Sequence, residues 1–191
     1  MICESDHARV KEECELAEPE PFVLEVLPRL PKGLVLDVAC GTGRHSVLLA
    51  SVGNRVVAVD NSLAVLAVLH DVAKKLQLPI YPVAADLGRF PLPVDTFDVI
   101  VNVNFLCRPL VAELKRALKP GGMLVFDTFL IDQAEIGRPR NPAFLLRHWE
   151  LREMLADLEL LEYREGLASR HDGRRSWRAS ALAIKPKPRH D

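Results

Sequence analysis

Ten consecutive residues, 34–43, constrain the fold of this chain more than any other segment. The apolar run Leu34–Val38 is followed at once by the glycine-spaced turn Gly41-Thr42-Gly43. The run predicts a buried strand, and Arg44–Val52 predicts a helix that ends at Gly53. A strand, a glycine loop and a helix in this order bring a ligand against bare backbone and the amide-rich start of a helix. The segment therefore predicts an α/β fold with a ligand site after its first strand.

The charge of Asp37 distinguishes between ligands for this loop. In a dinucleotide site the loop faces a pyrophosphate, which a carboxylate directly before the loop would repel. S-adenosylmethionine carries an ammonium and a sulfonium group and no phosphate, so it would be attracted instead. The third glycine of the dinucleotide pattern G-x-G-x-x-G, counted from Gly41, is also replaced, by Ser46. We therefore expect S-adenosylmethionine as the cofactor, with a nicotinamide-dependent oxidoreductase as the alternative.

Carboxylates also follow the next two predicted strands. Arg55–Val59 leads into Asp60, which can accept both ribose hydroxyls of an adenosine, whether in NAD or in S-adenosylmethionine. Ile80–Ala84 is followed by Asp86, for which the alternative role is a turn cap. Acidic residues at three successive strand ends together predict a cofactor site.

Composition fits one domain with a full hydrophobic core. Of the 191 residues, 49% are hydrophobic and 27% charged. We expect a single domain over 1–191, with an acidic leader over 1–20 and a frayed tail over 186–191. Charged residues interrupt every apolar stretch before it reaches membrane-spanning length, and the N-terminus lacks the pattern of a secretion signal.

Charge and cysteine content limit the kinds of ligand and partner that the chain is expected to bind. The net charge of −1 and the sequence pI of about 6.6 argue against an extended nucleic-acid surface. The four cysteines form no CxxC pair, so no metal site is predicted. Cys40 and Cys107 are expected to be reduced thiols in a cytoplasmic protein. The sequence indicates no oligomeric state.

The rest of the chain alternates predicted helices and strands. Helices are expected from Ser62, as the capping residue, to about Gln77, over Pro109–Leu118 and over His148–Leu155. The remaining strands are expected at Phe97–Val103, Met123–Phe129, Leu158–Arg164 and Trp177–Ile184, with a stop signal at Lys119-Pro-Gly-Gly and a turn at His171-Asp-Gly-Arg. This order predicts a doubly wound, seven-stranded, mostly parallel sheet that ends in a C-terminal antiparallel hairpin.

Several motifs resemble those of a known family. The spelling Asp37-x-Ala39-x-Gly41-x-Gly43 resembles motif I of the class I S-adenosylmethionine-dependent methyltransferases, [D/E]-x-G-x-G-x-G, with Ala39 in place of the first glycine. Phe97–Ile100 resembles motif IV of this family, and 118–126 resembles the entry to its fifth strand. Segments similar to its tellurite-resistance (TehB-like) branch are Cys40–Ser46, Asp127–Phe129 and Gly137–Pro142. This resemblance implies methylation of a small acceptor, such as a thiol or a metalloid oxyanion of the tellurite or selenite type.

The motif positions and strand ends give the cofactor-binding residues that we predict. They are Asp37, Ala39, Cys40, Gly41, Gly43, Asp60, Asn61, Asp86, Leu87 and Asn102. Candidates for acceptor contact or catalysis are fewer, because soft nucleophiles need little help from a general base. They are Asn104, His45, Arg138 and Arg140, with Arg170 and His171 in the hairpin turn as further candidates. Asn104 has a turn cap as its alternative role, and His45 a contact at the start of its helix.

Two further questions stay open on the sequence alone. The apolar stripe on Pro21–Leu27 predicts a short helix, which packs on the sheet edge in one interpretation and forms a lid over the substrate in the other. Besides an enzyme acting on small molecules, the chain could be a non-catalytic cofactor-binding protein, or an RNA or protein methyltransferase.

Overall fold

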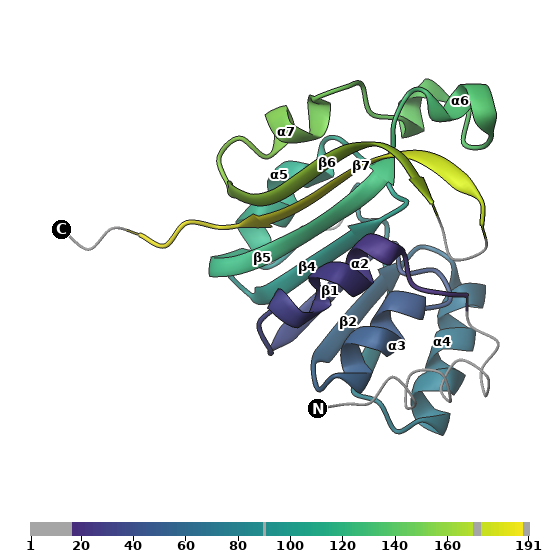
Figure 1. The fold of residues 1–191 in the computed structure, drawn as a ribbon. Helices are drawn as coiled ribbons and strands as arrows, with labels where there is room; N and C mark the ends of the chain where they lie inside the picture. The colour runs from purple at the N-terminus through teal and green to yellow at the C-terminus, as the bar shows by residue number, and fades with distance from the viewer. Residues whose placement is uncertain (1–16, 90, 170–172, 189–191) are drawn as a thin grey trace.

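A seven-stranded sheet forms the centre of the molecule in the computed structural model, which describes residues 17–89, 91–169 and 173–188 (Figure 1). The strand order is β3-β2-β1-β4-β5-β7-β6. Strands β1 to β5 are parallel, and β7 is antiparallel to both β5 and β6. The strands are β1 (Leu34–Val38), β2 (Arg55–Asp60), β3 (Ile80–Ala84), β4 (Phe97–Val103), β5 (Leu118–Phe129), β6 (Glu159–Ser169) and β7 (Arg175–Ile184). The predicted sheet with its closing antiparallel pair is confirmed.

Helices cover both faces of the sheet, as a doubly wound fold requires. They are α2 (Pro21–Val26), η1 (Leu27–Arg29), α3 (Arg44–Ser51), α4 (Leu63–Lys75), α5 (Leu110–Ala117), α6 (Gln133–Ile136), η2 (Pro142–Phe144) and α7 (Glu150–Met154). One core contains the buried faces of α2, α3 and α4, and the other contains those of α5 and α7. Alternate residues of β4 enter the two cores, with Val99 and Val101 in the first and Ile100 in the second.

Several element ends differ from the predicted ones. The Ser62 side chain makes no capping hydrogen bond; instead its backbone N–H donates to Asp60 Oδ1 at 2.9 Å. Strand β5 begins directly after α5, and the predicted stop signal lies within it, where Gly121 has a φ of +81°. Helix α7 starts only at Glu150, because Trp149 has a left-handed φ of +67°.

The short elements α6 and η2 follow β5 and were not predicted. Strands β6 and β7 extend beyond their predicted bounds, toward the hairpin turn. Part of that turn, 170–172, lies outside the described residues, as do 1–16 of the acidic leader and 189–191 of the tail.

The strand order reverses between β1 and β4, since the chain crosses to β2 and β3 on one side and to β5 on the other. In doubly wound sheets, ligands bind outside the carboxyl ends of the strands at such a reversal. The glycine loop after β1 and the segment after β4 both lie at this position.

A bidentate ion pair ties α7 to the segment before α5. Arg108 Nε donates to Glu150 Oε1 at 2.6 Å, and Arg108 Nη2 donates to Oε2 at 3.0 Å. The backbone N–H of Arg147 also donates to Glu150 Oε2, at 2.8 Å. Hydrogen bonds from Arg108 lower the pKa of Glu150 from its usual 4.5 to about 2. The carboxylate therefore stabilises the fold while it is ionised.

We expect Glu150→Gln to lower the free energy of unfolding at pH 7 by about 1.5–3 kcal/mol, the range for hydrogen bonds to charged groups. Because the folded pKa of Glu150 lies below the unfolded one, its contribution is full above the unfolded value and is lost as the pH falls from 4.5 toward 2. Urea unfolding at pH 7 and pH 3 should show the difference between parent and variant shrinking at pH 3.

Glu153→Gln, in the same helix and exposed, provides the control and should change stability by less than about 0.5 kcal/mol. An equal loss in both variants, or a difference that is constant with pH, would contradict the stabilising role of Glu150.

Candidate functional site

Left-handed backbone shapes the loop between β1 and α3. Ala39, Gly41 and Gly43 have φ values of +50°, +55° and +87°. A Cβ on Gly43 would lie 2.2 Å from Leu69 Cδ1, whereas a Cβ on Gly41 would meet nothing within 4 Å. The space beside Gly41 is the room that a ligand needs to lie against bare backbone. Ala39, which stands where motif I has its first glycine, adopts the same backbone region at a cost of about 1 kcal/mol.

Asp37 lies beneath this loop and is 1% exposed. Its Oδ2 accepts a hydrogen bond of 2.6 Å from Ser46 Oγ. Burial raises the pKa of Asp37 from its usual 3.8 to about 7, although the hydrogen bond from Ser46 and the charge of Arg44 oppose this. The carboxyl group is thus partly protonated at neutral pH, and a cation bound near the loop would favour its ionised form.

Five of the predicted cofactor residues line one cavity of about 350 Å³ at the ends of β1, β2 and β3. The lining residues are Ala39, Asp60, Asn61, Ala85, Asp86, Leu87, Gly88, Phe105 and Cys107. Asp60 also holds the glycine loop, because its Oδ2 accepts from the backbone N–H of Gly41 at 2.9 Å. Asp86 caps its own turn by accepting from Gly88 N–H at 2.9 Å, so the alternative role is met while the residue still lines the cavity.

The other predicted cofactor residues support this wall and are not among the lining residues of the cavity. Cys40 is buried, and burial raises the pKa of its thiol well above the usual range. Asn102 is 1% exposed, and its Nδ2 donates to the carbonyl of Phe105 at 2.8 Å, which fixes the segment after β4. Direct contact of these residues with a cofactor stays a prediction.

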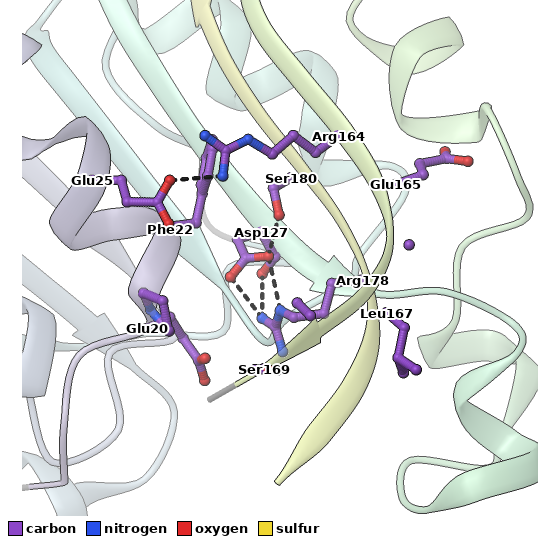
Figure 2. Close-up of a pocket in the computed structure, with 13 residues that line it drawn as sticks. Glu20, Phe22, Glu25, Asp127, Arg164, Glu165, Leu167, Ser169, Arg178 and Ser180 are labelled. Atoms are coloured by element: carbon purple, nitrogen blue, oxygen red, sulfur yellow. Dashed lines mark hydrogen bonds and ion pairs between the residues drawn. The ribbon is translucent and has the colours of Figure 1, made fainter. Parts of the chain in front are cut away.

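A second cavity, of about 360 Å³, lies between α2 and strands β5, β6 and β7 (Figure 2). Its lining residues are Glu20, Pro21, Phe22, Glu25, Asp127, Arg164, Glu165, Gly166, Leu167, Ala168, Ser169, Arg178 and Ser180. A buried bidentate ion pair lies at its wall. Arg178 Nε donates to Asp127 Oδ1 at 2.9 Å, and Arg178 Nη2 donates to Asp127 Oδ2 at 2.8 Å. Ser180 Oγ donates to Asp127 Oδ1 at 2.8 Å, across the β5–β7 register. We refer to this space as the α2 cavity.

Glu20 links the α2 cavity to the start of α3 and to the end of β4. Its backbone N–H donates to His45 Nε2 at 3.1 Å, and its Oε1 accepts from Asn104 Nδ2 and Arg44 Nη2, each at 3.0 Å. Asn104 Oδ1 in turn accepts from Arg178 Nη2 at 2.7 Å. Since Phe105 lines the first cavity and Asn104 contacts Glu20 and Arg178 of the α2 cavity, the β4 end lies between the two cavities.

These contacts define the surroundings of two of the candidate acceptor residues. Burial lowers the pKa of His45 to about 3, so its ring is neutral and accepts from the backbone of the leader. Asn104 has a left-handed φ of +57° and lies within the network around the α2 cavity.

The other candidates lie elsewhere. Arg138 and Arg140 are exposed between α6 and η2, and neither is a lining residue of the two cavities. Arg140 Nε donates to the carbonyl of Gly137 at 3.3 Å. Arg170 and His171 lie outside the described residues.

Sequence reasoning missed Glu20, Arg44 and Arg178. One usable signal existed, because Arg178 is a single charged residue within the apolar run Trp177–Ile184. A charge in an interior strand requires a partner, and Asp127 in the adjacent strand provides it. The contacts of Glu20 depend on how the leader folds back over the loop, for which no spacing rule exists.

The described residues contain neither a cluster suited to a metal ion nor a helix that could span a membrane. No cluster of three or more His, Cys, Asp or Glu side chains there could hold a metal ion. None of the helices in that part of the chain is both long and apolar enough to cross a bilayer.

Comparisons with known proteins agree with this geometry. Residues 35–122 match the model of a family described as "Methyltransferase domain". The chain is 33% identical over 137 residues to "Probable thiol methyltransferase 2" of Arabidopsis thaliana, covering 65% of this chain and 60% of that protein. It is 30% identical over 142 residues to "Hemagglutinin 1" of Eikenella corrodens, covering 71% of this chain and 47% of that protein. The chain thus spans roughly half the length of these curated relatives.

Among solved structures, TehB from Haemophilus influenzae has the same fold, with a TM-score of 0.82 at 23% identity. The superposition covers 94% of this chain and 66% of that one. The matched family model spans the glycine loop, both acidic strand ends that follow it and the start of β5. Residues 35–122 thus match a methyltransferase domain, and the chain has a fold of the TehB type.

Proposed function

We propose that this protein transfers the methyl group of S-adenosylmethionine to a small, soft nucleophile, and that this acceptor is a thiol. The observation that carries the proposal is the arrangement of two cavities on either side of the β4 end. One has the acidic lining expected for an adenosine. The other provides a separate space for an acceptor.

The residues of the first cavity fit the cofactor chemically. Asp60 keeps acceptor capacity beyond its bonds to the backbone N–H groups of Gly41 and Ser62, because a carboxylate has about four lone-pair sites. Asp86 and Leu87 offer a polar and an apolar contact for an adenine. The open space at Gly41 leaves room for the methionyl part, and Asp37 beneath the loop provides the negative charge that a sulfonium favours.

The charge of the α2 cavity favours a thiol over a metalloid oxyanion. Its lining contains the carboxylates Glu20, Glu25, Asp127 and Glu165 but only the guanidinium groups Arg164 and Arg178. Both guanidinium groups are already in ion pairs, with Glu25 and Asp127. An anion would enter a field with no excess positive charge, whereas a neutral thiol loses its proton only at the point of reaction.

The reaction needs alignment more than acid–base catalysis. A C–S bond forms between the acceptor sulfur and the methyl carbon, while the bond from that carbon to the cofactor sulfur breaks and the thiol proton passes to solvent. The protein must bring the acceptor to about 3–3.5 Å in line with the leaving sulfur and keep water out of the line of attack on the methyl carbon. Pro21 and Phe22 of α2 line the cavity, which supports a lid formed by Pro21–Leu27.

The direct test is turnover with isotopically labelled methyl donor across small thiols, selenite, tellurite, amines and RNA. We expect labelled thioethers, identified by mass spectrometry, at rates above those with either oxyanion. Label in RNA or in no acceptor at all would contradict the proposal. Parallel calorimetric titrations with S-adenosylhomocysteine and NAD separate it from the oxidoreductase alternative, which predicts tight NAD binding.

Asp60→Ala should weaken the binding of S-adenosylhomocysteine by about 1.5–3 kcal/mol, through loss of charged hydrogen bonds to the ribose and of the bond that holds Gly41. Isothermal titration calorimetry measures this directly. Asp71→Ala, an exposed carboxylate in α4, is the matched control and should bind like the parent. If parent and Asp60→Ala bind S-adenosylhomocysteine with equal affinity, the ribose does not bind at Asp60.

Asp37→Asn should stabilise the empty protein while weakening its affinity for S-adenosylmethionine. Because the folded pKa of Asp37 is raised, its ionisation costs stability as the pH rises from 3.8 toward 7, and the cost is complete above that. The asparagine avoids this cost, so the gain in unfolding free energy should be on the order of 2–4 kcal/mol at pH 8.

Urea unfolding between pH 4 and pH 8 provides the measurement, and the gain should approach zero at pH 4. A stability difference that does not vary with pH would show that Asp37 does not titrate as described. If Asp37→Asn binds S-adenosylmethionine as tightly as the parent, the charge of Asp37 has no electrostatic role in binding.

A further inference from the structure

Arg178 has one guanidinium nitrogen without a hydrogen-bond partner among the described residues, at the wall of the α2 cavity. Its Nε and Nη2 donate to Asp127 and Asn104, but Nη1 is buried and unpaired. The whole residue is only 4% exposed. In Figure 2 this third nitrogen is turned away from Asp127, on the side of Glu20 and Ser169, which also line the cavity.

A buried and unpaired nitrogen of this kind indicates a binding site for a ligand. A guanidinium is charged at any pH that proteins tolerate, and all five of its N–H groups are donors. A buried donor without a partner costs about 1–3 kcal/mol, so such atoms are rare unless something else satisfies them. Because Nη1 belongs to a residue that lines a cavity, an acceptor molecule in that cavity could satisfy it.

The position of this donor is fixed before any ligand arrives. The bidentate pair with Asp127 and the hydrogen bond to Asn104 hold the plane of the guanidinium. On one side the plane is covered by Phe129, whose ring centroid lies 4.6 Å from Arg178 Cζ. Little side-chain freedom is therefore lost when a ligand binds to Nη1. Because the donor is held in place, it binds a ligand oxygen only at one position.

The charges around Nη1 determine which kind of oxygen it accepts. Asp127 already neutralises the guanidinium, and Glu20 and Glu165 add negative charge to the same lining. A ligand carboxylate would therefore meet repulsion as well as the hydrogen bond. A carbonyl oxygen gains the hydrogen bond without that repulsion.

We propose that Arg178 Nη1 is a specificity-determining donor that binds a neutral carbonyl oxygen of the acceptor. The acceptor class is then a small thiol that also carries an amide, ester or ketone, in preference to a plain alkyl thiol or a mercapto acid. This inference rests on the proposed methyl transfer and specifies its substrate.

The test compares three thiols of similar size: 2-mercaptoacetamide, mercaptoacetate and 2-methylpropane-1-thiol. For the parent we expect kcat/KM for 2-mercaptoacetamide to exceed each of the others by about tenfold, with the gain mainly in KM. Arg178→Lys keeps a cation against Asp127 but removes Nη1, so these ratios should fall toward one. Each ratio compares two thiols on one enzyme, so a general loss of activity in the variant cancels. Dividing the parent's ratio by the variant's ratio also cancels the difference in acidity between the two thiols.

Arg164→Lys is the matched control, because Arg164 lines the same cavity and its guanidinium is ion-paired with Glu25. It should keep the ratios of the parent. Ratios that survive in Arg178→Lys, or a parent that prefers mercaptoacetate or the alkyl thiol, would overturn the proposal.

A binding measurement keeps the proposal testable if Arg178→Lys does not fold, and it separates this inference from the proposed function. The thioethers 2-(methylthio)acetamide and 2-methylpropyl methyl sulfide resemble the products and need no turnover. Titration of each into the parent in the presence of S-adenosylhomocysteine, followed by NMR, should show about tenfold tighter binding of the amide. Equal binding would overturn the role of Arg178, whereas tighter amide binding without methylation of any thiol would overturn only the proposed function.

Discussion

Two carboxylates on neighbouring strands hold the glycine loop, and the cavity at the ends of β1, β2 and β3 depends on that loop. Asp37 in β1 binds Ser46 in the first turn of α3, which anchors the helix to the strand. Asp60 at the end of β2 binds the backbone of Gly41 in the middle of the loop. Since Ala39 of the loop lines the first cavity and His45, just after the loop, accepts from the backbone of Glu20, these two contacts position both the wall of that cavity and the leader.

The leader segment is integrated into the site through polar contacts as well as apolar packing. Glu20 contacts the start of α3 and the end of β4, and Phe22, Val23 and Val26 of α2 are buried in the core beside it. On the outer side, Arg164 of β6 pairs with Glu25 and lies 5.5 Å over the Phe22 ring. A segment that precedes the fold in sequence thus forms one wall of the α2 cavity, and its movement would change the volume of that cavity.

The sequence predicted the sheet well, because its buried parallel strands are continuous apolar runs. Element ends were less accurate. The glycines after Lys119 indicated a stop, but the stretch lies within β5, where Gly121 N–H donates to the carbonyl of Lys185 and the carbonyl of Gly122 accepts from Lys185 N–H. Trp149 shortened α7 through a backbone conformation that residue type alone does not predict.

Five of the predicted cofactor residues line one cavity, whereas none of the predicted acceptor residues that the structure describes lines either cavity, for a physical reason. Ala39, Asp60, Asn61, Asp86 and Leu87 follow strand ends, which the topology brings to one edge of the sheet. The α2 cavity instead combines the leader with two antiparallel strands far along the chain, so its members share no local pattern. Arg138 and Arg140 fitted an anion site by residue type alone, yet they lie in an exposed loop.

Partial protonation of Asp37 has a consequence for how ligand binding is measured. A cationic ligand selects the ionised carboxylate, so each binding event would release a fraction of a proton to the buffer. The heat recorded on mixing would then vary with the ionisation enthalpy of the buffer, while a ligand without the positive sulfur would give a weaker dependence. Comparing two buffers at one pH would count the protons released, and so reveal the charge state of a side chain that solvent barely touches.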